Sequence, residues 1–437
     1  MNMQIQAGMK AASGKSKDGL ERSIGLFGAV AYGVGTIVGA GVYALIGPGV
    51  ANAGNAVWLA FVIAAVIASF TGLCYAKLSS IYPTAGAEYD YVGQATKSKF
   101  LAFVVGWLVI LSAIISVAAV ALGFGGYLQA ITGVPGPLFA IGLIMVMSAV
   151  NFMGIKESLV ANIVLTIIEV AGVVIIIFLG AGSLGTVDYL ETPNGLDGIM
   201  AAVGVIFFAF IGFEGLVKIG EETKDPARTI PRALILSMII STTLYVLAAL
   251  SVVSLLPHQE LAGSSAALAD AAEAAGGAQV GLAMSMIALI STANTVLILL
   301  IATSRIAYGM SKRSALPVFL SRVHPREKTP HFAIAVSMAL AILFCAFGDI
   351  KFVANMANYT IFIVFLAVDS ALLLLWRRNV VKGRWFVVPA ILGVASSLVM
   401  LTQFDLVVTV LSLAVTALGA LAYRLISPQL RSGLVRT

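Results

Sequence analysis

Gly33 to Gly49 reads GVGTIVGAGVYALIGPG, and six of its seventeen residues are glycine. The stretch lies in an apolar segment that begins at Ile24 and is long enough to cross a bilayer as a helix. Glycine costs a helix interior about 1 kcal/mol relative to alanine, so this many glycines predict a helix that breaks. Inside a membrane, broken backbone is tolerated only where it faces a cavity or a ligand. The stretch therefore predicts a binding site made of backbone groups.

The composition of the whole chain indicates a polytopic membrane protein. Of its 437 residues, 60% are hydrophobic and 11% are charged, and the mean hydropathy is +1.03. A soluble domain of this size does not need so much apolar surface. The two cysteines, Cys74 and Cys345, fall in apolar segments and support neither a disulfide framework nor a metal site. We therefore expect no metal and no cofactor.

Long apolar runs recur along the chain and predict an all-α protein with twelve transmembrane helices. The predicted spans are 24–47, 56–79, 100–130, 137–155, 157–182, 199–219, 230–256, 278–310, 331–348, 350–376, 385–403 and 405–426. The connection at 79–98 is aromatic and predicts an amphipathic helix at the membrane surface. The connection at 257–277 predicts a short surface helix.

The placement of charge predicts the orientation of these spans. If the N-terminus is cytoplasmic, only Lys351 of the 26 lysines and arginines falls outside. This positive-inside pattern fits an even number of spans with both termini in the cytoplasm. The net charge of +6 then reflects topology, so we expect no nucleic-acid partner. The expected location is the cell (plasma) membrane of a prokaryote, with the lipid bilayer as the surrounding partner and no obligate protein partner.

The sixth predicted span contains a second interruption, in which Gly212 and Gly215 flank Glu214. Spans one and six each open a block of five spans, and five is odd, so the two blocks lie in opposite orientations. Paired broken helices in two inverted halves indicate a transporter substrate site at the bilayer midplane. The predicted divisions are a cytoplasmic tail at 1–23, a first repeat at 24–182, a second repeat at 199–378, two further spans at 384–426 and a cytoplasmic tail at 427–437.

The paired breaks have two interpretations. Freed amides at the end of a half-helix suit a carboxylate and freed carbonyls suit an ammonium, and an α-amino acid presents both groups. Alternatively, the glycines only allow helices to pack closely.

Several longer stretches carry a family resemblance: GVGTIVGAGVY (33–43), PTAGAEYDY (83–91), NFMGIKES (151–158), FFAFIGFEG (207–215), GEETKDPARTIPRA (220–233) and ATSRIAYGMSKRSALP (302–317). In these the chain resembles the amino acid-polyamine-organocation (APC) superfamily, with motifs closest to its cationic-amino-acid-transporter-like branch. The resemblance covers about residues 24 to 378. It implies a five-plus-five inverted repeat (LeuT-like fold) with discontinuous helices 1 and 6, two extra C-terminal spans, and amino acid transport by alternating access.

The resemblance also implies the residues of a substrate site. The carboxylate-binding amides would be those of Ala40 and Gly41, with Gly39 making room, and the ammonium-binding carbonyls those of Ile37, Phe208 and Ile211. Phe208 and Phe210 would cover the substrate, and Phe208 stands where relatives often have tryptophan. Small or polar pocket walls are expected at Ser112, Ser116, Asn294 and either Asn355 or Asn358.

Buried acids indicate how transport could be driven, because an ionised acid at mid-membrane is costly and usually functional. Glu169 lies in the middle of span five, where proton-coupled relatives often carry a lysine, and could itself pick up and release a proton. It could alternatively help to hold a cation with Ser291, Thr292 and backbone oxygens of span one. Glu214 matches a glutamate that relatives use for coupling or gating. Asp369 is expected near the inner edge, within reach of Arg377, in a structural role.

The expected function is secondary active transport of amino acids, coupled first to protons and alternatively to sodium or to exchange. A membrane-embedded enzyme is disfavoured because the spans carry no histidine except His331 at the end of one, and no HExxH or GxSxG element. A channel is disfavoured because paired breaks favour occlusion of one ligand over a continuous pore. A sensor that uses the same site without turnover is the alternative outside the transporter class.

Overall fold

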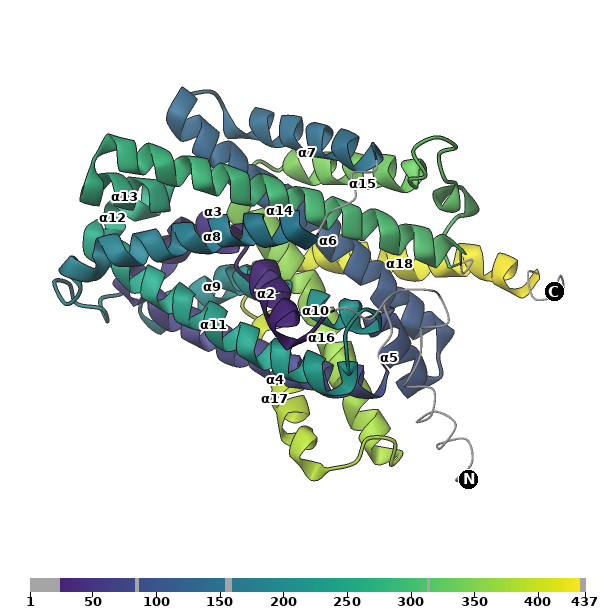
Figure 1. Cartoon of the computed structure of the whole chain (residues 1–437). Coiled ribbons are helices and arrows are strands. Elements are labelled where there is room, and N and C mark those ends of the chain that lie inside the picture. Colours follow the sequence, from purple (N-terminus) through teal and green to yellow (C-terminus); the bar gives the residue numbers. More distant parts are fainter. Residues whose placement is uncertain (1–23, 83–85, 154–158, 313–314, 433–437) are drawn as a thin grey trace.

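The computed structural model describes residues 24–82, 86–153, 159–312 and 315–432. Within these ranges the chain is helical and contains no β-strand (Figure 1). The predicted N-terminal tail at 1–23 lies outside the described residues, as do the GIKES part of one motif and the last five residues of the predicted C-terminal tail.

Each predicted span coincides with one helix or with a broken pair of helices. The first six spans correspond to α2 (Leu26–Ile37) with α3 (Ala40–Ala53), α4 (Val57–Ile81), α6 (Lys99–Thr132), α7 (Gly136–Phe152), α8 (Leu159–Gly180), and α9 (Gly195–Ile206) with η3 (Phe207–Phe210) and α10 (Gly215–Lys218). The other six correspond to α11 (Pro226–Leu255), α14 (Ala278–Lys312), α15 (His331–Cys345), α16 (Ile350–Arg377), α17 (Val387–Leu401) and α18 (Leu406–Ser432). The helix α18 continues past the predicted boundary at 426.

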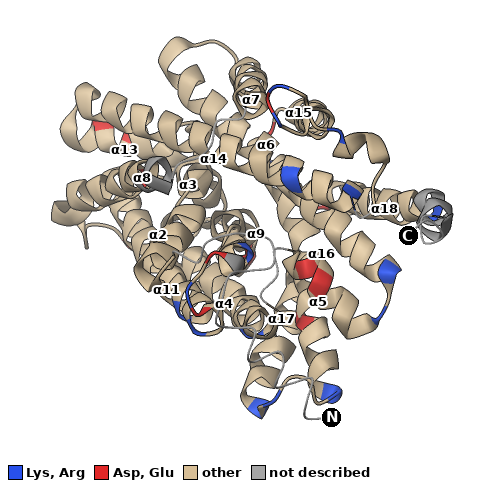
Figure 2. Ribbon diagram, turned by 45° about the vertical axis from the view of Figure 1, so that its right-hand side comes forward, with Lys and Arg blue, Asp and Glu red and all other residues tan. Residues whose placement is uncertain are grey.

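Nine helical segments of the described chain are long and apolar enough to cross a membrane. The first of them, Leu26–Ile81, contains two predicted spans, and two further apolar helices, α7 and α15, are shorter. The described chain is therefore an all-helical polytopic membrane protein. Figure 2 shows that lysines and arginines lie mainly at helix ends, while the middles of the helices are largely uncharged.

Two connections also form helices. Short helices occupy the predicted surface connection, α12 (His258–Gly263) and α13 (Ala267–Gly276), and α13 packs against α14. The aromatic connection forms a helix, as predicted, which is α5 (Ala87–Thr96). One face of α5 is buried against α6 and α16, and this face includes Glu88 and Tyr91. The helix is therefore part of the packed bundle, because its aromatic face finds apolar partners there.

The long helices pack as two groups. The broken helices α2, α3, α9 and α10 lie against α4 and α11, and the densest contacts in the molecule join α4 to α11. A second group contains α6, α7, α14 and α15; α7 and α15 lie side by side at its edge (Figure 1). α5 joins α6 and α16, and α8 lies between the groups, against α2, α11 and α14. This arrangement places both broken helices in the interior.

Candidate functional site

The first broken helix interrupts where its glycines predict. α2 ends at Ile37, and α3 begins at Ala40 after Val38 and Gly39, whose backbone angles are not helical. The Ala40 amide then donates to Thr295 Oγ1 of α14 at 3.3 Å. Thr295 is one residue beyond the predicted wall residue Asn294, so sequence reasoning found the correct helix but missed the side chain that caps the break.

The second broken helix has a longer interruption. α9 ends at Ile206, the 3₁₀ turn η3 follows, and α10 begins only at Gly215. Gly212 has a φ of 126°, which L side chains rarely adopt. Its amide donates to Glu214 Oε2 at 2.9 Å, so the predicted coupling acid folds back onto the break that contains it.

The two breaks lie against each other. A Cβ added at Gly41 would lie 2.5 Å from the Ala209 Cα, and a Cβ added at Gly212 would overlap the Thr36 carbonyl oxygen. Glycine is therefore required at both crossing points for the backbones to approach. These two glycines therefore do allow close packing, and the segments that they pack together are the breaks themselves.

Tyr245 of α11 joins the two breaks. Its hydroxyl lies 2.5 Å from the Ile37 carbonyl oxygen and 3.1 Å from that of Ala209, so it donates to the backbone of either break. The Phe210 ring meets the Tyr245 ring nearly edge-on, with 5.4 Å between centroids. Sequence reasoning missed Tyr245. The available signal was a tyrosine in the middle of an apolar span, where a hydroxyl needs a polar partner.

We predict that Tyr245→Phe lowers transport about tenfold and lowers the thermal midpoint, because two buried carbonyls lose their shared donor, at a cost of about 1–3 kcal/mol. Initial uptake rates in proteoliposomes and unfolding in detergent measure the two effects. Tyr423→Phe is the matched control, since Tyr423 packs on Phe100 and Phe103, away from the breaks. A Tyr245→Phe protein that transports at the parent rate would contradict the bridging role.

The predicted wall residues have different surroundings. Ser112 donates to the Ala357 carbonyl of α16, and Asn358 donates to the Gly204 carbonyl of α9. Ser116 is buried, and its hydroxyl has no hydrogen-bond partner among the described residues. Asn294 donates to Glu169 Oε1 at 3.2 Å. Ser112 and Asn358 thus tie helices together, whereas Asn294 belongs with the predicted coupling acid.

The predicted covering and ammonium-binding residues lie in the turn η3 and just after it, except Ile37, which ends α2. Phe208 is 5% exposed and Phe210 is fully buried, so both rings are inside the bundle. The Phe208 carbonyl accepts from the Ile211 amide at 3.1 Å, and the Ile37 carbonyl accepts from Tyr245. Both carbonyls therefore already have one donor in this conformation, and each oxygen retains a second lone pair.

Glu169 lies close to the first break. It is 1% exposed, its carboxylate accepts from Asn294, and its backbone carbonyl accepts from the Tyr43 hydroxyl of α3. Ser291 and Thr292 of α14 are also fully buried, and the Thr292 hydroxyl donates back to its own helix, to the Ala288 carbonyl at 2.7 Å. Glu169 of α8 is therefore held at its backbone by α3 and at its carboxylate by a neutral amide of α14.

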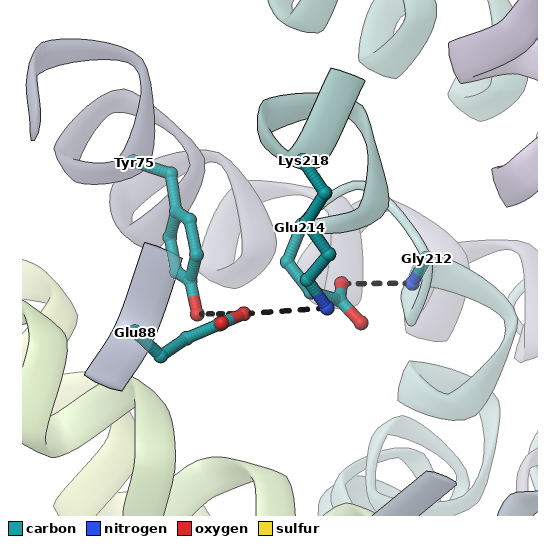
Figure 3. Close-up of polar contacts among 5 residues, drawn as sticks. All are labelled: Tyr75, Glu88, Gly212, Glu214 and Lys218. Atoms are coloured by element: carbon teal, nitrogen blue, oxygen red, sulfur yellow. Dashed lines mark hydrogen bonds and ion pairs between the residues drawn. The ribbon is translucent and has the colours of Figure 1, made fainter. Parts of the chain in front are cut away.

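A second polar cluster lies next to the second break, the one that contains Gly212 (Figure 3). Lys218 Nζ is 3.7 Å from Glu88 Oε1, and the Tyr75 hydroxyl donates to the same oxygen at 3.3 Å. Glu214, just before α10, and Lys218, its last residue, stand side by side. The Glu88 side chain is 4% exposed and that of Lys218 is 28% exposed. Sequence reasoning singled out Glu214 but neither Lys218 nor Glu88.

The position of Asp369 differs from the prediction. It is fully buried between α16, α4 and α17: Thr71 donates to its Oδ2 at 2.9 Å, and a Cβ on Gly393 of α17 would overlap the carboxylate. The described residues contain no salt bridge between Asp369 and Arg377. Helix packing therefore covers Asp369, where access to water was expected.

Comparisons with known proteins cover most of the chain. The family model described as amino acid permease matches residues 24–424. The chain is 29% identical to the branched-chain amino acid permease of Bacillus subtilis, over 89% of this chain and 87% of that protein. It is 28% identical to the methylthioribose transporter of Bacillus subtilis, over 95% of each chain. It is 32% identical to the vacuolar cationic amino acid transporter 4 of Arabidopsis thaliana, over 79% of this chain and 62% of that protein.

Proposed function

Since the chain belongs to the amino acid permease family of the APC superfamily, we propose that it is a secondary active transporter that moves amino acids across the cell membrane by alternating access. The family and these relatives are transporters, which makes an enzymatic role unsupported. The observation that carries the proposal is the crossing of two broken helices in the interior, at Gly41 with Ala209 and at Gly212 with Thr36.

The proposed architecture has twelve spans, in two inverted repeats of five and an additional pair. The helix boundaries support this division, because α2–α3 and α9–α10 occupy corresponding first positions of the two blocks. α3 packs on α9 and α2 packs on α10, so the first half of each broken helix lies against the second half of the other, which supports an inverted repeat. The positive-inside pattern supports cytoplasmic termini in a plasma membrane.

The proposed substrate contacts are backbone groups at the first break and at the second. The amides of Ala40 and Gly41 at the start of α3 would receive the carboxylate, with Gly39 making room. The Ala40 amide has only a 3.3 Å bond to Thr295, so a carboxylate can replace that acceptor with a stronger, charge-assisted bond. The second lone pairs of the Ile37, Phe208 and Ile211 carbonyls would receive the ammonium.

The proposed coupling ion is the proton, with Glu169 as its carrier and Glu214 as a second candidate. Glu169 accepts from a neutral amide and is almost completely buried, which suits a carboxyl group that is protonated and released in turn. Sodium is the alternative ion, since Glu169 stands beside α14, which carries the hydroxyl groups of Ser291 and Thr292. Exchange of one amino acid for another is the alternative mode.

A two-stage experiment tests the proposed function. First, the purified protein is screened by thermal shift against the common amino acids at several pH values, with methylthioribose included because one relative carries that name. Each stabilising compound is then tested for uptake into proteoliposomes with and without an inward proton gradient. We expect at least one amino acid to be stabilising and to accumulate with the gradient.

Counterflow separates a transporter from a sensor. A transporter exchanges external labelled amino acid for an internal unlabelled pool, whereas a sensor binds the amino acid and shows no counterflow. Stabilisation by an amino acid without counterflow would overturn transport but keep the site. Accumulation that follows a sodium gradient instead of a proton gradient would overturn proton coupling alone.

A further inference from the structure

One end of the broken helices is tied together by backbone hydrogen bonds. The Ile24 amide, just before α2, donates to the Glu222 carbonyl at 3.1 Å, and the Lys224 amide donates to the Ile24 carbonyl at 2.8 Å. Leu216 of α10 also lies where a Cβ on Gly33 of α2 would make contact. We infer that α2 and α10, the two half-helices at this end, move as one unit.

The salt bridge between Lys218 and Glu88 connects this unit to a different part of the bundle. The structure gives two salt bridges for the described residues: Arg228–Asp225 is exposed and lies within one turn, and Lys218–Glu88 joins α10 to α5. α5 packs on α6 and α16, outside the unit of α2 and α10. Beside this salt bridge, Tyr75 packs edge-on against Tyr91 and Phe213, so the ion pair adjoins a cluster of aromatic rings.

We propose that Lys218 and Glu88 form a latch, a pair of positioning residues that holds the α2–α10 unit against α5 and must separate before the substrate site opens at that end. This inference rests on the proposed function only in its reference to the substrate. By the proposed orientation, this is the cytoplasmic end.

The neighbouring groups limit what it costs to open the latch. Separating a half-buried ion pair leaves each charge without a partner. This has a high cost in free energy unless other groups replace the contact. Glu214 lies four residues before Lys218, at the start of α10, and stands beside it. Lys218 therefore keeps a carboxylate neighbour when α10 leaves α5. Glu88 keeps the Tyr75 hydroxyl, which reaches it from α4. The latch is therefore reversible.

The two single substitutions differ in their expected effect. Lys218→Gln leaves two carboxylates, Glu88 and Glu214, facing the site of the lost cation. Glu88→Gln leaves Lys218 with Glu214 as its neighbour. We therefore expect the latch to open more in Lys218→Gln than in Glu88→Gln, and the exchanged pair Lys218→Glu with Glu88→Lys to restore most of the closed state.

Accessibility of α10 measures the latch without requiring transport. Leu216 is 1% exposed, so Leu216→Cys in a Cys74→Ala, Cys345→Ala background places one buried thiol on the moving unit. Its rate of labelling by a membrane-impermeant thiol reagent is measured from each side of the membrane. We expect labelling from the cytoplasmic side to rise about tenfold with Lys218→Gln, by less with Glu88→Gln, and to fall back with the exchanged pair.

Arg228→Gln is the matched control, since it removes the exposed salt bridge of the same region and should leave the labelling rate unchanged. Equal labelling in the parent and both single variants would overturn the latch, as would an exchanged pair that labels as fast as Lys218→Gln. If Leu216→Cys impairs folding, protease protection of the chain after α10 gives the same comparison. A parent protein that transports none of the screened compounds would refute the proposed function and leave the labelling result valid.

Discussion

Gly212→Ala is expected to abolish transport. Gly212 has a φ of 126°, and an added Cβ would overlap the Thr36 carbonyl at the end of α2. A non-glycine residue in such a conformation costs about 1–3 kcal/mol, and the overlap with backbone adds to this cost because a backbone atom cannot rotate away. A penalty of about 3 kcal/mol or more would reduce the native crossing of the breaks by over roughly a hundredfold.

Substrate binding and transport should fall together in Gly212→Ala, because the crossing forms the site itself. Thermal shift measures binding and counterflow measures transport on the same preparation. Gly309→Ala is the matched control: Gly309 lies in α14, and a Cβ there would meet nothing within 4 Å. Normal substrate binding by a well-folded Gly212→Ala protein would show that the crossing is not part of the site.

The breaks could be predicted from the sequence because their cause is local. Glycine lowers helix stability wherever it stands, so the clusters at Gly33 to Gly49 and around Gly212 predict interruption without knowledge of their neighbours. The same is true of the helix ends, which follow from the lengths of apolar runs. The structure confirms an interruption in each of these two segments.

The side chains that complete the site could not be predicted in the same way, because their partners come from distant segments. Tyr245, Thr295 and Lys218 each make their contact with a helix far away in the sequence. Ser112 was expected as a pocket wall, and its hydrogen bond to a backbone carbonyl of α16 could not be predicted. In a span that is apolar on all sides, periodicity does not say which face is turned toward the site.

The packing of α5 could not be predicted for a related reason. Its aromatic and acidic residues suit a membrane surface, and composition alone cannot distinguish that surface from a contact with other helices. Glu88 became recognisable only through its partners, Lys218 and Tyr75. Because an acid is rarely buried without a partner, a charged residue on the apolar face of a short helix is a useful signal for such contacts.

Glu169→Gln is expected to remove the dependence of uptake on the proton gradient while retaining exchange. Glutamine has nearly the shape of glutamate, and its carbonyl oxygen can still accept from the Asn294 amide, so the local packing of α8 and α14 is kept. It cannot gain or lose a proton. Parent protein should accumulate substrate up to about tenfold per pH unit of inward gradient for one coupled proton, whereas Glu169→Gln should only equilibrate it.

Asp369→Asn is the matched control for this experiment, because it changes a second fully buried acid in the same manner. Asp369 lies between α4, α16 and α17, and its contact with Thr71 can persist with asparagine. We therefore expect Asp369→Asn to keep gradient-driven accumulation, and counterflow to be similar in both variants. If Glu169→Gln still accumulates substrate with the gradient, Glu169 is not the proton carrier, and the same measurement on Glu214→Gln then decides whether Glu214 has that role.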